Sequence, residues 1–156
     1  MGLAAGIKKL LPAFGHRNFR LFWSGQFVSL IGTHMQTVAM GWFVLRITDS
    51  SFYLGLVNSI GALPILLLSM YAGAIADRTS KRRLILTTQI AFLIQALALA
   101  LLASSGRAAV WSLILLSAMQ GTIHAFDAPA RQSFVSEMVA SDRVLSAVAL
   151  NSSVFN

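Results

Sequence analysis

The chain has 156 residues, of which 56% are hydrophobic and only 11% are charged. Soluble domains carry roughly 25% charged residues, so this composition excludes an ordinary soluble domain, and the high hydrophobicity excludes intrinsic disorder. The net charge of +7 lies in short islands between charge-free stretches. That arrangement argues against nucleic-acid binding, which needs a clustered basic face, and it is typical of an integral membrane protein.

Four charge-free stretches are long enough to cross a bilayer as helices, because about 20 apolar residues span its hydrocarbon core. After a cytoplasmic tail at residues 1–20, we expect transmembrane helices over residues 21–45, 53–76, 84–104 and 108–126. Residues 127–143 mix charged and apolar side chains at helical spacing, which predicts a cytoplasmic amphipathic segment. Residues 144–156 are too short to span, so we interpret them as the truncated start of a fifth helix.

The basic residues indicate how these helices are oriented. Of the 12 Lys and Arg residues, all but Arg46 and Arg107 lie in the N-terminal tail, in the turn after residue 76, or after residue 126. Loops rich in Lys and Arg stay on the cytoplasmic side of a membrane. We therefore expect a multi-pass protein of the plasma (cytoplasmic) membrane, embedded in the lipid bilayer, with a cytoplasmic N-terminus.

Polar residues share one face of the first expected span, where steps of 100° per residue place them within about 80° of Gln26. A polar face would lose free energy against lipid, so it must point at protein or water. The face either forms interhelical hydrogen bonds or lines a hydrated cavity, and its two glutamines and one histidine favour the cavity. The fourth span repeats the pattern. The predicted cavity-lining residues are Gln26, Ser29, Thr33, His34, Gln36, Thr37, Ser117, Gln120 and His124.

The other two spans differ in character. The second carries a stripe of small residues, which favours close helix packing, and Pro64 near its middle predicts a kink. The third is the most apolar, with Gln95 as the one polar residue between positions 90 and 102, and we expect it to be the outermost helix. His34 and His124 have side chains that can carry protons, but a neutral hydrogen-bonding role in packing is the preferred interpretation for each.

The turn after the second span holds the most specific pattern, because residues 73–83 read G-A-I-A-D-R-T-S-K-R-R. An acid at Asp77 works against a basic flank, so it should have a partner, either a basic residue or the N-terminal end of a neighbouring helix. The turn resembles the motif G-x-L-x-D-R-x-G-R-[KR] of the major facilitator superfamily, with Ile75 for Leu and Lys81 for Arg. Ser80 replaces the second Gly, which predicts a turn without a positive φ at that position.

Two further segments carry the same resemblance. Residues 18–22 are similar to the lead-in to the first helix of that superfamily, and residues 126–135 (F-D-A-P-A-R-Q-S-F-V) resemble the segment after helix 4 in the enterobactin-exporter and macrolide-efflux branch. The resemblance implies an all-α membrane fold of twelve helices in two halves, of which this chain holds helices 1–4 and the start of helix 5. It also implies that Asp77 bridges to the other half and that Lys81 or Arg82 pairs with Asp127. The gating residues it implies are Gly73, Asp77, Arg78, Lys81, Arg82 and Asp127.

The function implied is that of the N-terminal part of a secondary active transporter, which exports a drug or siderophore-like small molecule by alternating access. Proton coupling follows only from the family, because Ser117 stands where many drug–proton antiporters carry an Arg. Its partners would be the substrate and the missing C-terminal remainder of the transporter. The alternative is a self-contained or degenerate four-helix membrane protein with a structural or regulatory role and no transport alone. No HExxH, GxSxG or CxxC motif is present, so we expect neither an enzyme nor a metal or cofactor site.

Overall fold

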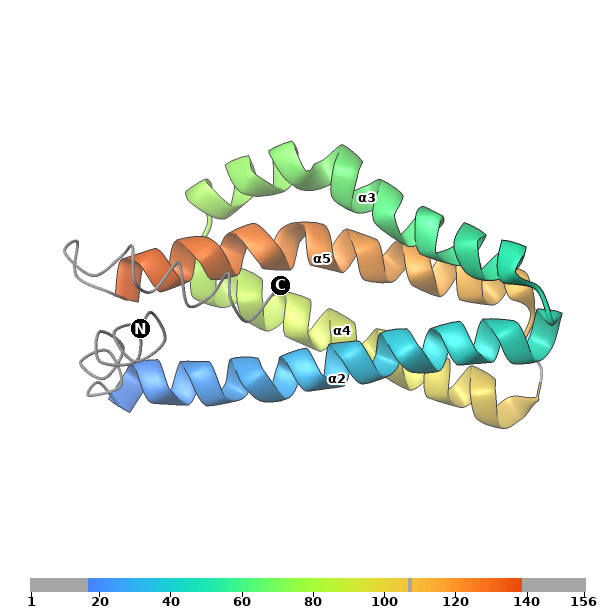
Figure 1. Ribbon diagram of the computed structural model, residues 1–156. Coiled ribbons are helices and arrows are strands. Elements are labelled where there is room, and N and C mark those ends of the chain that lie inside the picture. The colour runs from blue at the N-terminus through green and yellow to red at the C-terminus, as the bar shows by residue number, and fades with distance from the viewer. Residues whose placement is uncertain (1–16, 107, 139–156) are drawn as a thin grey trace, which may run out of the picture. The chain divides into compact units, whose positions relative to one another are not determined.

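A computed structural model describes residues 17–106 and 108–138, and within these ranges it contains four α-helices joined by short turns (Figure 1). These are α2 (Arg17–Thr48), α3 (Ser51–Arg78), α4 (Lys81–Ser105) and α5 (Val110–Met138). The expected all-α architecture is therefore confirmed. By length and composition, three of these helices can cross a membrane: α2 over Trp23–Thr48, α3 and α4.

Helix α5 differs from the expected fourth span in its length and its polarity. It runs without a break from Val110 to Met138, past the expected end of the span at residue 126 and through Pro129. Salt-bridged side chains four residues apart support a helix locally, and Asp127 and Arg131 form such a pair across this proline. A fourth span over residues 108–126 remains a prediction, and so does the rest of the 127–143 segment. Residues 139–156, including the expected start of a fifth helix, lie outside the described residues.

The turns between the helices are short, and individual residues cap the helix ends beside them. Asp49 has a φ of 47°, and its N–H donates to the Leu45 carbonyl over 2.8 Å, which ends α2. Ser80 has a φ of −62° and its hydroxyl accepts from the Arg83 N–H, so it caps α4 and confirms a turn without positive φ there. Gly106, with a φ of 65°, ends α4 in the left-handed conformation that glycine adopts most readily.

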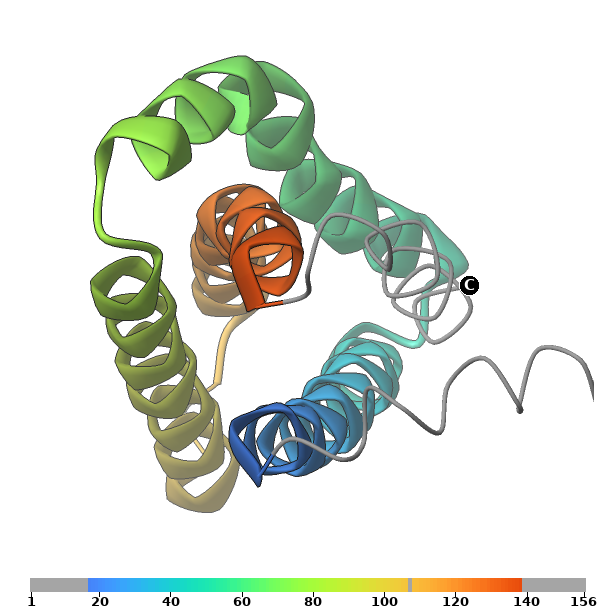
Figure 2. The ribbon, with the colours of Figure 1, turned by 90° about the vertical axis from the view of Figure 1, so that its left-hand side faces the viewer.

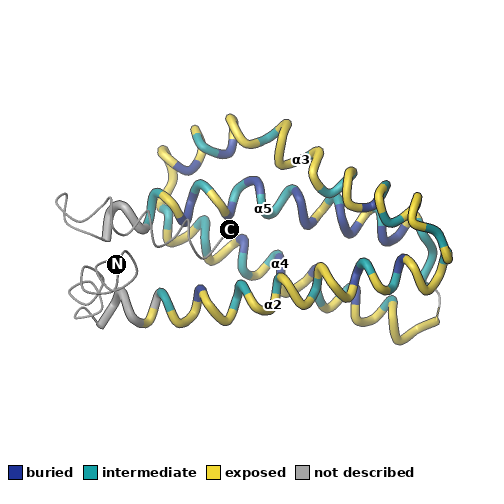
Figure 3. The backbone as a smooth tube through the Cα atoms, in the orientation of Figure 1, coloured by how far each residue is buried: buried dark blue, intermediate teal, exposed yellow. Residues whose placement is uncertain are grey.

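Residues 34–131 form one compact unit, in which α5 is flanked by α3, α4 and the second half of α2 (Figure 2). Dark blue marks of burial concentrate on α5, whereas α3 is largely exposed (Figure 3). Helix α3 bows about its middle, where Pro64 removes one backbone hydrogen bond (Figure 1). The apolar core lies near the ends of the helices that meet at Asp49 and Gly106. It consists of Met40, Val44, Val57, Leu99, Leu113 and Leu116.

The outside of the bundle carries many exposed apolar side chains. Helix α4 buries one face through Phe92, Gln95 and Leu99, while Leu93 and Leu101 on other faces are more than half exposed. In water this surface would be unfavourable, but in a bilayer it faces hydrocarbon. The same arrangement holds on α3, where Leu66 is 74% exposed and Met70 is 86% exposed. A one-sided contact of this kind suits an outer position for α4, which remains a prediction.

Candidate functional site

Within residues 34–131, most of the buried polar side chains lie on α5. Near its expected cytoplasmic end lies Asp127, of which only 6% is exposed. The Nε of Arg131, one turn later, lies 2.5 Å from the carboxylate Oδ2 of Asp127. The hydroxyl of Thr88 on α4 donates to Oδ1 over 2.6 Å, and the side-chain amide of Gln89 donates to the same oxygen over 3.4 Å. The carboxylate is thus buried, paired and hydrogen-bonded across two helices.

An ion-pair partner of Asp127 lies on its own helix. Asp127 forms an ion pair with Arg131. The physical reason is geometric, because residues four apart on a helix already face each other and need no movement between helices to meet. The charge of Arg131 also neutralises a carboxylate that would be costly to bury alone. The contact of Asp127 with Lys81 or Arg82 that the resemblance implies remains a prediction.

A second polar group lies deeper in the bundle, around Gln95 of α4. This side chain is fully buried. Its amide donates to the Leu116 carbonyl of α5 over 3.2 Å, and its carbonyl oxygen accepts a hydrogen bond from Gln36 of α2. Gln95 therefore joins three helices. Sequence reasoning gave it no role, although a single polar side chain in an otherwise apolar span was a usable signal, because such a group needs a partner in a membrane.

Helices α3 and α5 approach each other closely at two glycines. A Cβ added to Gly121 would overlap the carbonyl group of Gly61, with the carbonyl carbon 2.9 Å away. A Cβ on Gly61 would lie 2.5 Å from the Ser117 hydroxyl. That hydroxyl donates to the Val57 carbonyl over 2.8 Å, so Ser117 ties α5 to α3. The crossing is of the small-residue type that lets membrane helices approach closely.

The two histidines occupy the region between the two polar groups. His124 of α5 packs edge-on against Phe92 of α4, with ring centroids 4.8 Å apart. His34 of α2 is exposed and close enough to His124 for an electrostatic interaction. Gln120 is 9% exposed, one turn before His124 on α5. The structure therefore brings together polar residues of the first and fourth expected spans.

The remaining predicted cavity residues lie on α2. Thr37 is exposed. In the separate compact unit that includes the first half of α2, Gln26 is buried, and Ser29 and Thr33 are half-buried. The Thr33 hydroxyl donates to the Ser29 carbonyl within the helix.

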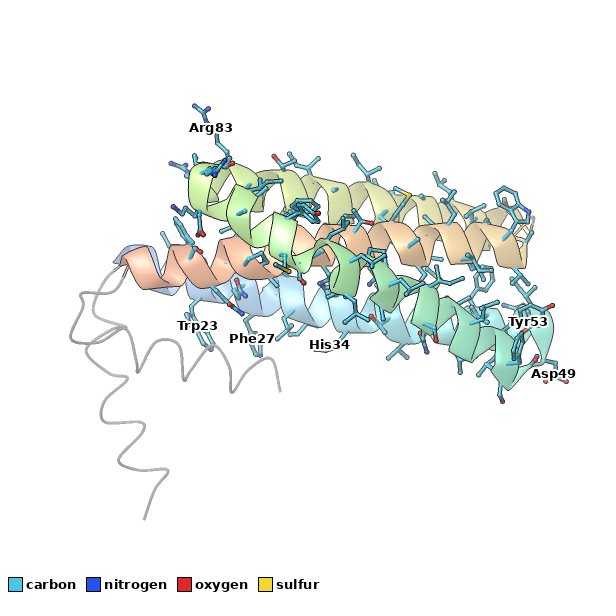
Figure 4. The ribbon with its side chains drawn as sticks, turned by 90° about the horizontal axis from the view of Figure 1, so that it is seen from above. Trp23, Phe27, His34, Asp49, Tyr53 and Arg83 are labelled. Atoms are coloured by element: carbon cyan, nitrogen blue, oxygen red, sulfur yellow. The ribbon has the colours of Figure 1, made fainter. Side chains whose placement is uncertain are left out.

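The expected gating residues at the α3–α4 turn are mostly at the surface. Asp77, Arg78 and Arg82 are exposed, Lys81 is half-buried, and the space beside Gly73 is open. Figure 4 shows the side chains of these helices and labels Arg83 at the start of α4, where it projects away from the bundle. Within the described residues, Asp77 has no ion pair or hydrogen bond, so any partner lies elsewhere.

An apolar exterior, a helix with buried polar residues and this charged turn are typical of helical membrane proteins that carry polar substrates or ions. The chain belongs to the transmembrane secretion effector family of the major facilitator superfamily, whose sequence model matches residues 9–156. It is therefore a multi-pass membrane protein of a transporter family and not an enzyme, and the resemblance found in the sequence is confirmed.

One curated relative is similar over most of the chain. It is the staphyloferrin A transporter of Staphylococcus aureus, strain NCTC 8325 / PS 47, which is 32% identical over 138 residues. The match covers 88% of this chain but 35% of the relative, so the chain spans about a third of the length of that protein. No solved structure matches the chain.

Proposed function

We propose that the chain is the N-terminal part of a secondary active transporter that exports a small molecule by alternating access. The observation that carries this proposal is the polar side of α5, where Gln120, His124 and Asp127 stand in a bundle whose outside is apolar. Such residues inside a membrane mark substrate or ion pathways. The secretion function of the family supports export as the direction.

The substrate we propose is a siderophore-like molecule. The support is the similarity to a staphyloferrin A transporter, which narrows the drug or siderophore alternatives that the sequence leaves open. Within residues 34–131, the cavity face we propose consists of His34 and Thr37 of α2 with Gln120 and His124 of α5. Gln26, Ser29 and Thr33 remain cavity residues predicted from the sequence alone. We assign Gln36 and Ser117 to the edge of this face. Their side chains already form hydrogen bonds with Gln95 and with the Val57 carbonyl, so they are less available to a substrate.

The gate we propose is the α3–α4 turn, on the cytoplasmic side of the membrane. Asp77 is exposed and without a partner within the described residues, so it is available to the N-terminal end of a helix in the other half of the transporter. The basic residues Arg78, Lys81 and Arg82 lie beside it. In this arrangement Asp127, held by Arg131 and Thr88, keeps α4 and α5 together as one element during the movement.

The proposal is tested by transport in inside-out membrane vesicles that contain the intact transporter. Labelled staphyloferrin A should accumulate in these vesicles when a proton gradient is imposed, and collapse of the gradient by a protonophore should abolish the accumulation. Asp77→Asn should reduce the initial rate while leaving the amount of protein in the membrane unchanged. Equal accumulation in vesicles that lack the transporter would overturn the proposed function, and a wild-type rate in Asp77→Asn would overturn the proposed gate.

A further inference from the structure

The first turn of α4 carries two neighbouring arginines, Arg82 and Arg83. Arg82 and Arg83 are both exposed, and neither forms an ion pair with a described residue. The first turn of α4 contains no acidic residue, although acids are the residues favoured at this positive end of a helix. Two arginines in this position repel each other and the helix dipole, so an anion beside them would be stabilising.

The two arginines lie on the same side of α4 as a row of exposed apolar residues, at its N-terminal end. Taking 100° per residue from Leu86, Arg82 and Arg83 fall within about 60° of it, and so do Ile90, Leu93 and Leu97 further along α4. The four apolar residues are between 53% and 60% exposed. Figure 4 shows Arg83 pointing away from the other helices. A basic end and an apolar stripe therefore lie in line on the outside of the bundle.

We propose that this surface, Arg82 and Arg83 followed by the apolar stripe of α4, is a binding site for an anionic phospholipid. The two guanidinium groups would hold the phosphate of the headgroup, and the acyl chains would lie along Leu86, Ile90, Leu93 and Leu97. Arginine matches phosphate well because its planar fork donates two parallel hydrogen bonds. The two arginines are complementary to a lipid headgroup, and the apolar stripe beside them is complementary to its acyl chains. A free phosphate would match the arginines alone.

The lipid site shares Arg82 with the proposed gate, whereas Arg83 and the apolar stripe lie outside it. Arg83 lies beyond the motif residues of the turn, and its side chain points away from the buried polar residues of α5. Lipid binding needs only the folded helices in a bilayer. Its measurement therefore does not depend on whether export, the substrate or the gate is assigned correctly.

The test is the lipid retained by the intact protein after extraction from nanodiscs that contain equal amounts of phosphatidylglycerol and phosphatidylcholine. Native mass spectrometry gives the ratio of the two bound lipids. We expect wild type to prefer phosphatidylglycerol. Arg83→Gln should lower this preference about fivefold, the contribution of one basic residue near an anionic membrane surface, and Arg82→Gln should add a similar loss. Arg83→Lys should retain more of the preference than Arg83→Gln.

Arg46→Gln is the matched control, because it removes an exposed arginine from the opposite end of the bundle. Its lipid preference should equal that of wild type. The proposal is overturned if Arg83→Gln keeps the wild-type ratio, or if Arg46→Gln lowers the ratio as much. Millimolar inorganic phosphate should leave the bound lipid in place, and its displacement would assign the arginines to a free anion instead.

Discussion

Arg131 forms a salt bridge with Asp127, which lies one turn earlier on α5, and 2.5 Å separate the guanidinium nitrogen from the carboxylate oxygen. Only 8% of each side chain is exposed, so the pair is shielded from water. Thr88 adds a hydrogen bond to the same carboxylate from α4. The pair thus neutralises a buried acid within one helix, and the threonine connects it to the next.

Removing one partner of this ion pair should lower the free energy of unfolding more than removing both partners. Arg131→Gln leaves a buried carboxylate without its counter-charge and should lower the free energy of unfolding by about 3 kcal/mol or more. The double variant Asp127→Asn, Arg131→Gln buries two neutral amides and should recover most of that loss. Unfolding of the purified protein in mixed detergent micelles measures both. Equal stabilities of the single and double variants would contradict the buried pair.

The Gln36–Gln95 hydrogen bond should show measurable coupling between α2 and α4. Replacing each glutamine by leucine, singly and together, gives a double-mutant cycle in which each single variant leaves the other amide without its partner. We expect a coupling energy of about 0.6 kcal/mol, and no more than about 1.7 kcal/mol, as for other side-chain hydrogen bonds in membrane bundles. Gln95→Leu should be the more destabilising single variant, because Gln95 also bonds to the Leu116 carbonyl. Strict additivity of the two substitutions would contradict the contact.

The contact of α3 with α5 should tolerate no added methyl group on Gly121. Gly121→Ala places its Cβ against the backbone of Gly61, which cannot move aside, so the cost should be about 1–3 kcal/mol of unfolding free energy. Gly61→Ala meets the Ser117 hydroxyl instead, and removing that hydroxyl with Ser117→Ala should relieve part of its cost.

Gly55→Ala is the control for both glycine variants, since it lies on α3 with open space around it. It should leave stability unchanged or raise it by up to about 1 kcal/mol, through the higher helix propensity of alanine. A Gly121→Ala protein as stable as Gly55→Ala would show that the two helices do not approach as described.

The orientation of the chain can be determined with single cysteines, because residues 1–156 contain none. Thr79 lies in the α3–α4 turn and Ser104 near the end of α4, and both are exposed. With a cytoplasmic N-terminus, a membrane-impermeant maleimide should label Ser104→Cys in intact cells and Thr79→Cys only after the cells are opened. Labelling of Thr79→Cys in intact cells would reverse the proposed orientation.

The sequence was most informative where the physical signal extends over many residues. Charge-free stretches predicted the helices, and the spacing of Gln120, His124 and Asp127 predicted a polar side on the last of them. Single contacts were less predictable. A single polar residue such as Gln95 has no periodicity that would show which way it faces. For Asp127, basic residues were available both at the α3–α4 turn and on its own helix. The sequence predicted helical spacing on both sides of residue 126 but not one unbroken helix. The change in polarity there indicates a membrane boundary and says nothing about whether the backbone stays helical.

The central claim is that this chain belongs to a transporter that moves its substrate out of the cell, and the most direct test is transport in membrane vesicles of both orientations. With the intact transporter and labelled staphyloferrin A, inside-out vesicles should accumulate the label against its gradient, and right-side-out vesicles should not. Accumulation by right-side-out vesicles alone would make the protein an importer and would contradict the account.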